Sequence, residues 1–417
     1  MKILFVVGQF PCISETFVLN QVVGLTKMGH DVRVVTFGKP EKDIVHEEYQ
    51  KYNIESKVIR LDNPIPHNKI KRFLHLLAIL RKLYSTVGIQ CFELLNWRKY
   101  GKIAYNGLLV HCSQLFFKLP WKPDAIIAHF ADIGLYTSAY HHCGLLKTPA
   151  FVVVHAHEIA ALTTEGINKK YKPLFDDELT YILPISKYWY DKLVKSGADC
   201  NRLKVFHMGV DLNYFHYHPR LGRTAGNVLK ILSVGRLVGQ KGYEYSVNAV
   251  IECHGRGVPV QYSIIGTGKL MDKLNGIINE NNASEYIHLL GVGNNEKVLE
   301  EMRNNDLFIL ASVTDDRGLM EGIPVALMEA MAIGIPVISS YHSGIPELIE
   351  NEKEGWLCQE KNVEEISQKI EYAYHNIDKC EQVIKAARLK IEREYSLEVL
   401  LIELVEIIKQ LADGQHG

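Results

Sequence analysis

The strongest constraint on the fold is an alternation of short β-rich runs with segments long enough to form helices. The first series of strand-like runs comprises residues 2–7, 31–37, 125–130, 151–156 and 181–186, and we expect residues 204–211 to close it. The second series comprises residues 229–235, 260–266, 286–291, 306–312 and 336–340. Strands that alternate with helices form parallel sheets covered by those helices. We therefore predict an α/β protein built from two doubly wound, Rossmann-like halves.

The length of the chain supports two domains, because 417 residues exceed what one ordinary hydrophobic core accommodates. We expect a first domain at residues 1–215, a second at 216–395, and a C-terminal helix at 396–417 that crosses back to the first domain. Doubly wound sheets bind ligands at the carboxyl ends of their strands. Two such domains facing each other predict a ligand site in the cleft between them.

The composition excludes several classes of protein. The chain is 47% hydrophobic and 23% charged, with a net charge of −1, so it lacks the basic excess of a dedicated nucleic-acid binder. No apolar run approaches the roughly 20 residues of a membrane-spanning helix. Residues 1–8 are interpreted as a first β-strand and not as a secretory signal. Eight cysteines without a CxxC pair favour reduced thiols in a cytoplasmic protein.

Several predicted strands end in a glycine loop. Gly8 follows the first strand, with Ser14 as a plausible N-cap of the next helix, and the pattern returns at Gly235 and Gly266. A glycine after a strand can be simple turn chemistry, and that reading stays open for each loop alone. Neither a Walker loop nor a GxGxxG fingerprint is present, which argues against a nicotinamide-dependent enzyme.

Two cations distinguish the loop at Gly235. Arg236 and Lys241 stand beside a predicted helix start, where free backbone N–H groups already favour anions. A diphosphate would accept a charge-assisted hydrogen bond from each of them. The alternative is that both are solvated loop residues.

Four segments together resemble glycosyltransferase family 4, whose members are retaining, nucleotide-sugar-dependent enzymes with the two-domain GT-B fold. They are VGRLVGQKG at 234–242, GTGKL at 266–270, the stretch at 318–349, and HMGVDLNYF at 207–215. The resemblance extends over essentially the whole chain and is densest at 229–349. Residues 10–21 further look like the branch that builds bacterial exopolysaccharides of the colanic-acid type.

The resemblance implies a role for each matched position on the donor side. Glu329 accepts hydrogen bonds from the donor ribose, and Glu321 faces the transferred sugar. Arg236 and Lys241 neutralise the pyrophosphate in place of a metal ion, so neither a metal nor a cofactor is expected. The expected donor is a UDP- or GDP-sugar. The expected donor-binding residues are Gly8, Arg236, Lys241, Gly266, Glu321, Gly322, Ile323, Pro324, Val325 and Glu329.

Histidines mark the acceptor side. His155 occupies the position of a family His-Gly-x-Asp-like motif, although Ala156 replaces the glycine and Glu158 the acid. We expect His155 to donate a hydrogen bond or shuttle a proton near the reacting sugar, whereas a structural histidine at a strand end is the alternative. Whether His155 or His157 meets the substrate stays open. The catalytic candidates are thus His155, Glu321, Arg236 and Lys241; the other acceptor-side candidates are Ser14, His129, His157 and Glu158.

A basic region lies between Lys57 and Lys122, with 12 Lys and Arg against two acidic residues. Residues 68–88 have the pattern of an amphipathic helix, in which Phe73, Leu77, Leu80 and Tyr84 share one side with Ile70. Such a helix can lie on an anionic membrane surface, at the inner face of the cell membrane. Equally, it can be a core helix whose cations reach outward to solvent.

The sequence thus predicts a retaining glycosyltransferase of exopolysaccharide or cell-surface polysaccharide synthesis, which transfers a sugar to a glycan or a lipid-linked acceptor. Two alternatives keep the fold: a nucleotide-sugar epimerase, and a sugar-nucleotide-binding protein that has lost catalysis. A glycan phosphorylase would need a lysine for pyridoxal phosphate in its own motif, and none is found.

Overall fold

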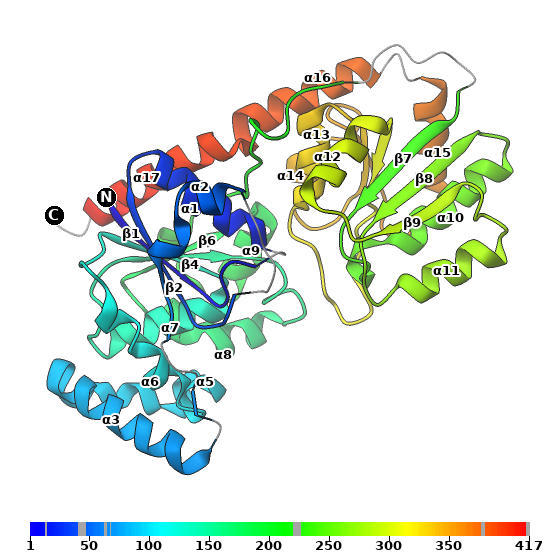
Figure 1. The fold of residues 1–417 in the computed structure, drawn as a ribbon. Helices are drawn as coiled ribbons and strands as arrows, with labels where there is room; N and C mark the ends of the chain where they lie inside the picture. Colours follow the sequence, from blue (N-terminus) through cyan, green and yellow to red (C-terminus); the bar gives the residue numbers. More distant parts are fainter. Residues whose placement is uncertain are drawn as a thin grey trace. The chain divides into compact units, whose positions relative to one another are not determined.

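The computed structural model describes residues 1–12, 15–40, 47–61, 65–66, 68–219, 227–376 and 380–413 (Figure 1). The chain forms two compact units. The first comprises residues 1–185, 190–206 and 401–417, and the second comprises residues 186–189 and 207–400.

The first unit is built on a six-stranded parallel sheet in the order β3-β2-β1-β4-β5-β6. Its strands are β1 (Lys2–Val7), β2 (Asp31–Thr36), β3 (Val58–Ile59), β4 (Ala125–His129), β5 (Ala150–Val154) and β6 (Thr180–Pro184). Every residue of β4, β5 and β6 is buried, as expected for a sheet with helices on both faces.

The helices of this unit include a cluster of short elements inserted between β3 and β4. The α-helices of the unit are α1 (Thr16–Lys27), α2 (Glu47–Lys51), α3 (Lys69–Val87), α4 (Trp97–Tyr100), α5 (Lys102–Tyr105), α6 (Leu108–Ser113), α7 (Ala131–His142) and α8 (Thr164–Phe175), together with α9 (Lys187–Lys195) from Tyr190 onward. The 3₁₀ turns are η2 (Ile54–Lys57), η3 (Gly88–Leu95), η4 (Phe116–Lys118) and η5 (Cys200–Arg202).

The second unit has a parallel sheet in the order β12-β11-β10-β7-β8-β9. Its strands are β7 (Leu229–Val234), β8 (Val260–Ile265), β9 (Ile287–Gly291), β10 (Leu307–Ile309), β11 (Val337–Ser340) and β12 (Trp356–Cys358). The helical elements are η6 (Gly239–Lys241), α10 (Tyr243–Gly255), α11 (Met271–Glu280), α12 (Asn295–Asn304), α13 (Val325–Ile333), α14 (Ile345–Leu348), α15 (Val363–His375), α16 (Cys380–Lys390) and a π-helical turn at Ile391–Tyr395.

Both sheets have the same topology when their strands are numbered within each unit. In each, the first and fourth strands are neighbours, and the chain winds outward in both directions from that pair. The pair is β1 and β4 in the first unit, and β7 and β10 in the second. Ligands of such sheets bind at the carboxyl ends of the strands where the winding reverses. The prediction of two doubly wound halves is confirmed.

Three strand predictions need correction. Residues 204–211 do not form a strand, because only Lys204 and Phe206 donate backbone hydrogen bonds to β6 and no continuous ladder develops. Two short edge strands, β3 and β12, were not predicted. Runs of two and three residues are too short to show an alternation of apolar and polar side chains.

The last helix, α17 (Leu397–Asp413), joins the first unit from Leu401 onward. It lies beside α1, where a Cβ atom on Gly24 would stand 2.2 Å from the Leu401 side chain (Figure 1). Tyr181 of β6 donates a hydrogen bond to the Leu411 carbonyl at 3.2 Å. Within the described residues, none of the helices combines the length and the apolar character needed to cross a bilayer.

Candidate active site

The glycine loops of the second unit bring backbone segments into direct contact at the carboxyl edge of its sheet. Gly266, after β8, has φ 151°, and a Cβ there would stand 1.9 Å from the Gly235 carbonyl oxygen. Gly242 has φ 67°, and its Cβ would stand 1.7 Å from the Ala311 carbonyl oxygen. Only glycine tolerates these contacts and dihedrals. The loops after β7, β8 and β10 are therefore fixed against one another at the switch point.

Lys241 and Glu321 form an ion pair at this edge. The Lys241 Nζ atom lies 3.0 Å from Glu321 Oε2, and the side chains are 13% and 15% exposed. Lys241 ends the short turn η6, just before Gly242, while Glu321 belongs to the loop that enters α13. Arg236, on the loop after β7, is exposed. A lysine held at a glycine-lined helix start is suited to an anionic ligand.

Glu329 lies in α13 among buried apolar residues and is itself only partly exposed. Burial raises the pKa of Glu329 to about 7, although the Lys241 ammonium acts to lower it. Within the described residues its carboxylate has no hydrogen-bond partner. Because an unpartnered buried carboxylate is costly, a ligand with hydroxyl donors would relieve it.

The turn Gly322–Pro324 leads directly into Val325, the first residue of α13. Pro324 is the N-cap and carries no N–H group, and its carbonyl accepts the Leu327 N–H at 3.1 Å. The first N–H groups of a helix have no partner within that helix. This turn therefore presents backbone donors next to the Glu321 carboxylate.

A hydrogen-bonded chain behind Glu321 was not predicted. The Glu321 N–H donates to His342 Nε2 at 3.0 Å, and His342 Nδ1 donates to Glu360 Oε1 at 2.5 Å. His342 is fully buried. Burial would raise the pKa of Glu360, but hydrogen bonds from the Thr314 N–H and from His342 lower it overall. An ionised Glu360 thus fixes the His342 tautomer that accepts the Glu321 N–H.

The signal for this chain is weak in the sequence. His342 lies within the family-like stretch at 318–349, but no feature of its spacing assigns it a partner. Glu360 follows β12, which was not predicted. Only the fold brings the ends of β10, β11 and β12 together around Glu321.

In the first unit, a chain of buried polar groups lies at the ends of β4 and β5. His129 Nε2 lies 3.0 Å from Gln21 Oε1, and His129 Nδ1 lies 3.1 Å from His155 Nε2. Burial lowers the pKa of His129 to about 3 and that of His155 well below its ordinary value. Both rings are therefore neutral. Because Gln21 Oε1 accepts, His129 accepts in turn from His155 Nε2–H, which leaves His155 Nδ1 as an acceptor.

Glu158 binds the backbone at the ends of β4 and β5. Its Oε1 atom accepts the N–H groups of His155 at 2.7 Å and of Ala131 at 3.2 Å. Burial raises the pKa of Glu158 to about 8, against the effect of these hydrogen bonds. Its Oε2 atom is buried without a hydrogen bond, 3.6 Å from Nδ1 of His157. The His157 side chain is 64% exposed, whereas His155 is buried, so the two histidines do not share one environment.

Aromatic rings surround His155. The ring of Phe130 lies 4.5 Å from that of His155 and 5.0 Å from that of His157, between centroids, and Phe17 lies 4.9 Å from His155. Phe130 has φ 74°, an uncommon value for a non-glycine residue. Such strain clusters at functional sites, and here the strained residue touches both candidate histidines.

The predicted residues fall into two groups, one in each unit. The second unit brings together Arg236, Lys241, Gly266, Glu321, Gly322, Ile323, Pro324, Val325 and Glu329. The first unit holds Gly8, His129, His155, His157 and Glu158. Gly8, predicted on the donor side, directly follows β1, so it shares a unit with the histidines. Ser14 lies outside the described residues.

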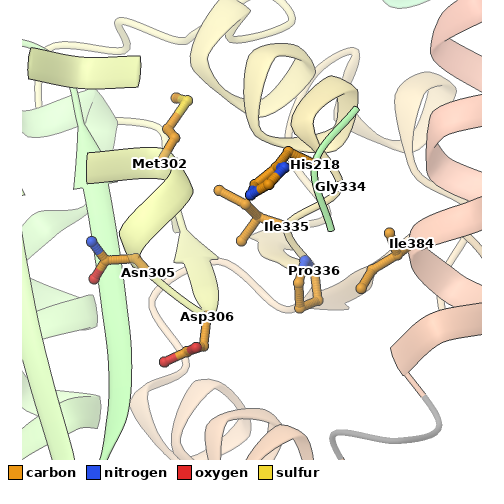
Figure 2. A pocket seen from close by; sticks show the side chains of 8 residues that line it. All are labelled: His218, Met302, Asn305, Asp306, Gly334, Ile335, Pro336 and Ile384. Atoms are coloured by element: carbon orange, nitrogen blue, oxygen red, sulfur yellow. The ribbon is translucent and has the colours of Figure 1, made fainter. Parts of the chain in front are cut away.

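A small cavity in the second unit is distinct from these groups. Figure 2 shows its lining, which includes Asp306 before β10 and Pro336 before β11. It therefore lies at the amino ends of the strands, at the edge opposite the glycine loops. Its volume of about 10 Å³ suffices for a single water molecule. This cavity is not a donor site.

A family model described as glycosyl transferases group 1 matches residues 222–390. WcaL of Escherichia coli strain K12, a glycosyltransferase assigned to colanic acid biosynthesis, is 32% identical over 99% of this chain and 100% of its own length. The amylovoran biosynthesis glycosyltransferase AmsK of Erwinia amylovora is also 32% identical, over 99% of this chain and 100% of its own.

Solved structures share the fold at lower identity. Anabaena HepE in complex with UDP has a TM-score of 0.71 at 15% identity, over 98% of this chain and 100% of HepE. The sucrose-phosphate synthase of Thermosynechococcus elongatus has a TM-score of 0.71 at 15% identity, over 99% of this chain and 100% of its own. The chain belongs to the group 1 glycosyltransferases and is a transferase with the GT-B fold.

Proposed function

We propose that this glycosyltransferase is a retaining enzyme that moves a sugar from a UDP-sugar to a glycan or lipid-linked acceptor during assembly of a bacterial exopolysaccharide. Two observations support the choice of polymer and donor. WcaL and AmsK are both named for exopolysaccharide synthesis. HepE, whose fold this chain shares, has structures with UDP and with UDP-glucose.

The observation that carries the donor side is the Lys241–Glu321 pair at the glycine-lined edge of the second sheet. In the free protein each charge neutralises the other. A diphosphate would take over the Lys241 ammonium and free the Glu321 carboxylate to accept hydrogen bonds from sugar hydroxyls. Lys241 and Arg236 would then stabilise the charge that develops on the diphosphate as the glycosidic bond breaks.

Glu329 completes the donor side as the acceptor for ribose hydroxyls. Its lack of a hydrogen-bond partner within the described residues, together with its pKa of about 7, suits a carboxylate whose partners arrive with the ligand. Binding of UDP would then favour the ionised form and release a proton when the pH is below 7.

His155 is the candidate for contact with the acceptor. Its neutral ring keeps Nδ1 as a hydrogen-bond acceptor, because Nε2 donates to His129. A lone pair of this kind accepts the hydrogen bond of an attacking hydroxyl and thereby orients it. The sequence predicts a hydrogen-bond donor or a proton shuttle at His155, whereas the hydrogen-bond chain favours acceptance at Nδ1. In a retaining mechanism with same-face attack, the leaving phosphate takes the remaining role of the base.

The first experiment is a thermal-shift screen of the full chain against UDP, GDP, ADP and their common sugars, run with and without EDTA. We expect a UDP-specific rise in Tm that EDTA does not change and that Glu329→Ala weakens. Glu280→Ala, at an exposed position ending α11, is the matched control. A shift for GDP alone would overturn the choice of base, and a shift abolished by EDTA would overturn the metal-free donor site.

Turnover then separates a transferase from a binding protein. Release of UDP from the best-binding UDP-sugar should require an acceptor preparation, such as lipid extracted from polysaccharide-producing cells. Binding without acceptor-dependent release would favour the alternative of an inactive sugar-nucleotide-binding protein.

A further inference from the structure

Large apolar side chains are exposed in one part of the first unit far more than elsewhere. Among the described residues, nine of the twenty large exposed apolar or aromatic side chains lie between residues 70 and 105. We call these nine the exposed apolar set: Ile70, Phe73, Leu74, Leu77, Tyr84, Ile89, Phe92, Trp97 and Tyr105. Single exposed hydrophobic residues need no explanation, but a concentration of this kind marks an interaction surface.

Helix α3 carries two adjoining groups of apolar residues that differ in burial. One group holds Ile79, Leu80 and Leu83, which are buried against the rest of the unit. The other group holds Phe73 and Leu77 at helical spacing, 60% and 45% exposed. The core interpretation of residues 68–88 would need this second group to be covered, and the first unit does not cover it. Leu80, which the helical pattern placed on the side of Phe73 and Leu77, is instead buried with Ile79 and Leu83.

The short elements after α3 extend the same character. Turn η3 packs directly against α3, and it exposes Ile89 and Phe92. Trp97 opens α4 and Tyr105 ends α5, and both are more than half exposed. Figure 1 shows α3 as an outlying helix of this unit, with α5 and α6 on its inner side. Tryptophan and tyrosine are the residues that membrane–water interfaces favour.

Charge distinguishes this region from the rest of the chain. Between residues 69 and 105 there are eight Lys and Arg and a single acid, Glu93. That acid forms an ion pair with Lys99 at 2.8 Å, which leaves the other seven basic side chains without an acidic residue of this region beside them. The region carries a net charge of +7 in a chain whose total is −1. Basic residues beside exposed apolar ones fit an anionic lipid surface.

We propose that the exposed apolar set and the basic residues among it dock this enzyme on an anionic bilayer. This inference deepens the proposed function, and it rests on that function only for the reason to be at a membrane. Two copies of the chain meeting through this surface would bring two charges of +7 together. Charge complementarity thus favours anionic lipid over self-association.

The experiment is flotation of the full chain with vesicles of phosphatidylcholine alone or with 30% phosphatidylglycerol, in ~50 mM and ~500 mM salt. We expect binding to the anionic vesicles that falls at least tenfold in the higher salt. The variant Phe73→Ser/Leu77→Ser/Trp97→Ser should reduce binding at least tenfold. The variant Val292→Ser/Tyr372→Ser/Leu389→Ser, at exposed positions of the second unit, should leave it unchanged.

Two outcomes would overturn the inference. One is an absence of binding to anionic vesicles at low salt while the protein is folded, as its Tm shows. The other is a concentration-dependent dimer in light scattering that the first variant disrupts, because the surface would then be a protein interface. The UDP-induced shift in Tm serves as the separate readout. If that shift persists while flotation fails, the membrane inference is wrong and the donor proposal stands.

Discussion

The two units share one strand order but equip the carboxyl edges of their sheets differently. The second unit places an ion pair, Lys241–Glu321, and Glu329, whose pKa is raised by burial, there. The first unit places Gln21, His129 and His155, three neutral groups in a buried hydrogen-bonded chain. In the second unit the charged side chains Lys241 and Glu321 remain partly exposed to solvent. In the first unit burial keeps the rings of His129 and His155 neutral.

The difference matches the two tasks of a glycosyl transfer. A nucleotide diphosphate is held by charge, so a lysine at a glycine-lined helix start suits the donor. An acceptor hydroxyl is neutral and must be oriented and partly deprotonated, so a neutral imidazole with a fixed tautomer suits it. The comparison predicts that variants of the two edges will affect different steps.

Loss of Lys241 should have the largest effect. Lys241→Ala removes the charge proposed to stabilise the leaving diphosphate, and we expect turnover to fall roughly a hundred- to thousandfold. The affinity for UDP should fall as well, in isothermal titration. Lys230→Ala, at an exposed position of β7, is the control and should change neither quantity. Full turnover in Lys241→Ala would remove Lys241 from the catalytic set.

Substitution of His155, at the carboxyl edge of the first sheet, should lower turnover without changing the affinity for UDP. His155→Ala should lower acceptor-dependent UDP release by about ten- to a hundredfold, because the acceptor hydroxyl loses the group that orients it. Its affinity for UDP should remain that of the unaltered chain. His157→Ala, at the exposed neighbour, should cost less than threefold, which would settle the choice between the two histidines. Equal losses in both variants would contradict the hydrogen-bond chain as the reason for choosing His155.

The sequence predicted the fold well because its signals are local. Apolar runs such as 2–7 and 229–235 give buried parallel strands, and the glycines that follow them give the tight loops. Residues 204–211 show the limit of this reasoning. They have the composition of a strand, yet only Lys204 and Phe206 donate to carbonyls of β6, and Val210 donates to the Tyr395 carbonyl instead.

The candidate site was predictable only where spacing carries the chemistry. Glu321 and Glu329 stand out as carboxylates in an apolar stretch, and Lys241 as a cation in a glycine loop. Gln21 and Glu360 look like ordinary polar residues until the fold places them against His129 and His342. The pKa values of His129 and His155 depend on how deeply the two rings are buried, which no sequence pattern reports.

His342 allows a sharper test of the donor edge, with a smaller expected effect. His342→Phe leaves the Glu321 N–H without its acceptor, so the Glu321 carboxylate should lose its placement. We expect the affinity for the UDP-sugar to fall about tenfold more than the affinity for UDP, because Glu321 is proposed to contact only the sugar. His342→Gln, whose amide can accept and donate at the same two places, should restore most of the difference. Equal losses for both ligands would mean that His342 only stabilises the fold.

The smallest effect concerns stability, and its sign follows from the raised pKa of Glu329. The native state keeps its proton up to about pH 7, whereas the unfolded carboxyl loses it near 4.5, so stability falls as the pH rises through this window. Since part of the side chain is exposed, we expect the free energy of unfolding to be lower by about 1–2 kcal/mol above pH 7. Glu329→Gln should therefore raise Tm by about 2–6 °C at pH 8 and hardly at pH 5, in calorimetry. Glu280→Gln should give no such difference. A gain that is equal at both pH values would show that burial does not strain this carboxylate, and the proposed release of a proton from Glu329 on UDP binding would then lose its basis.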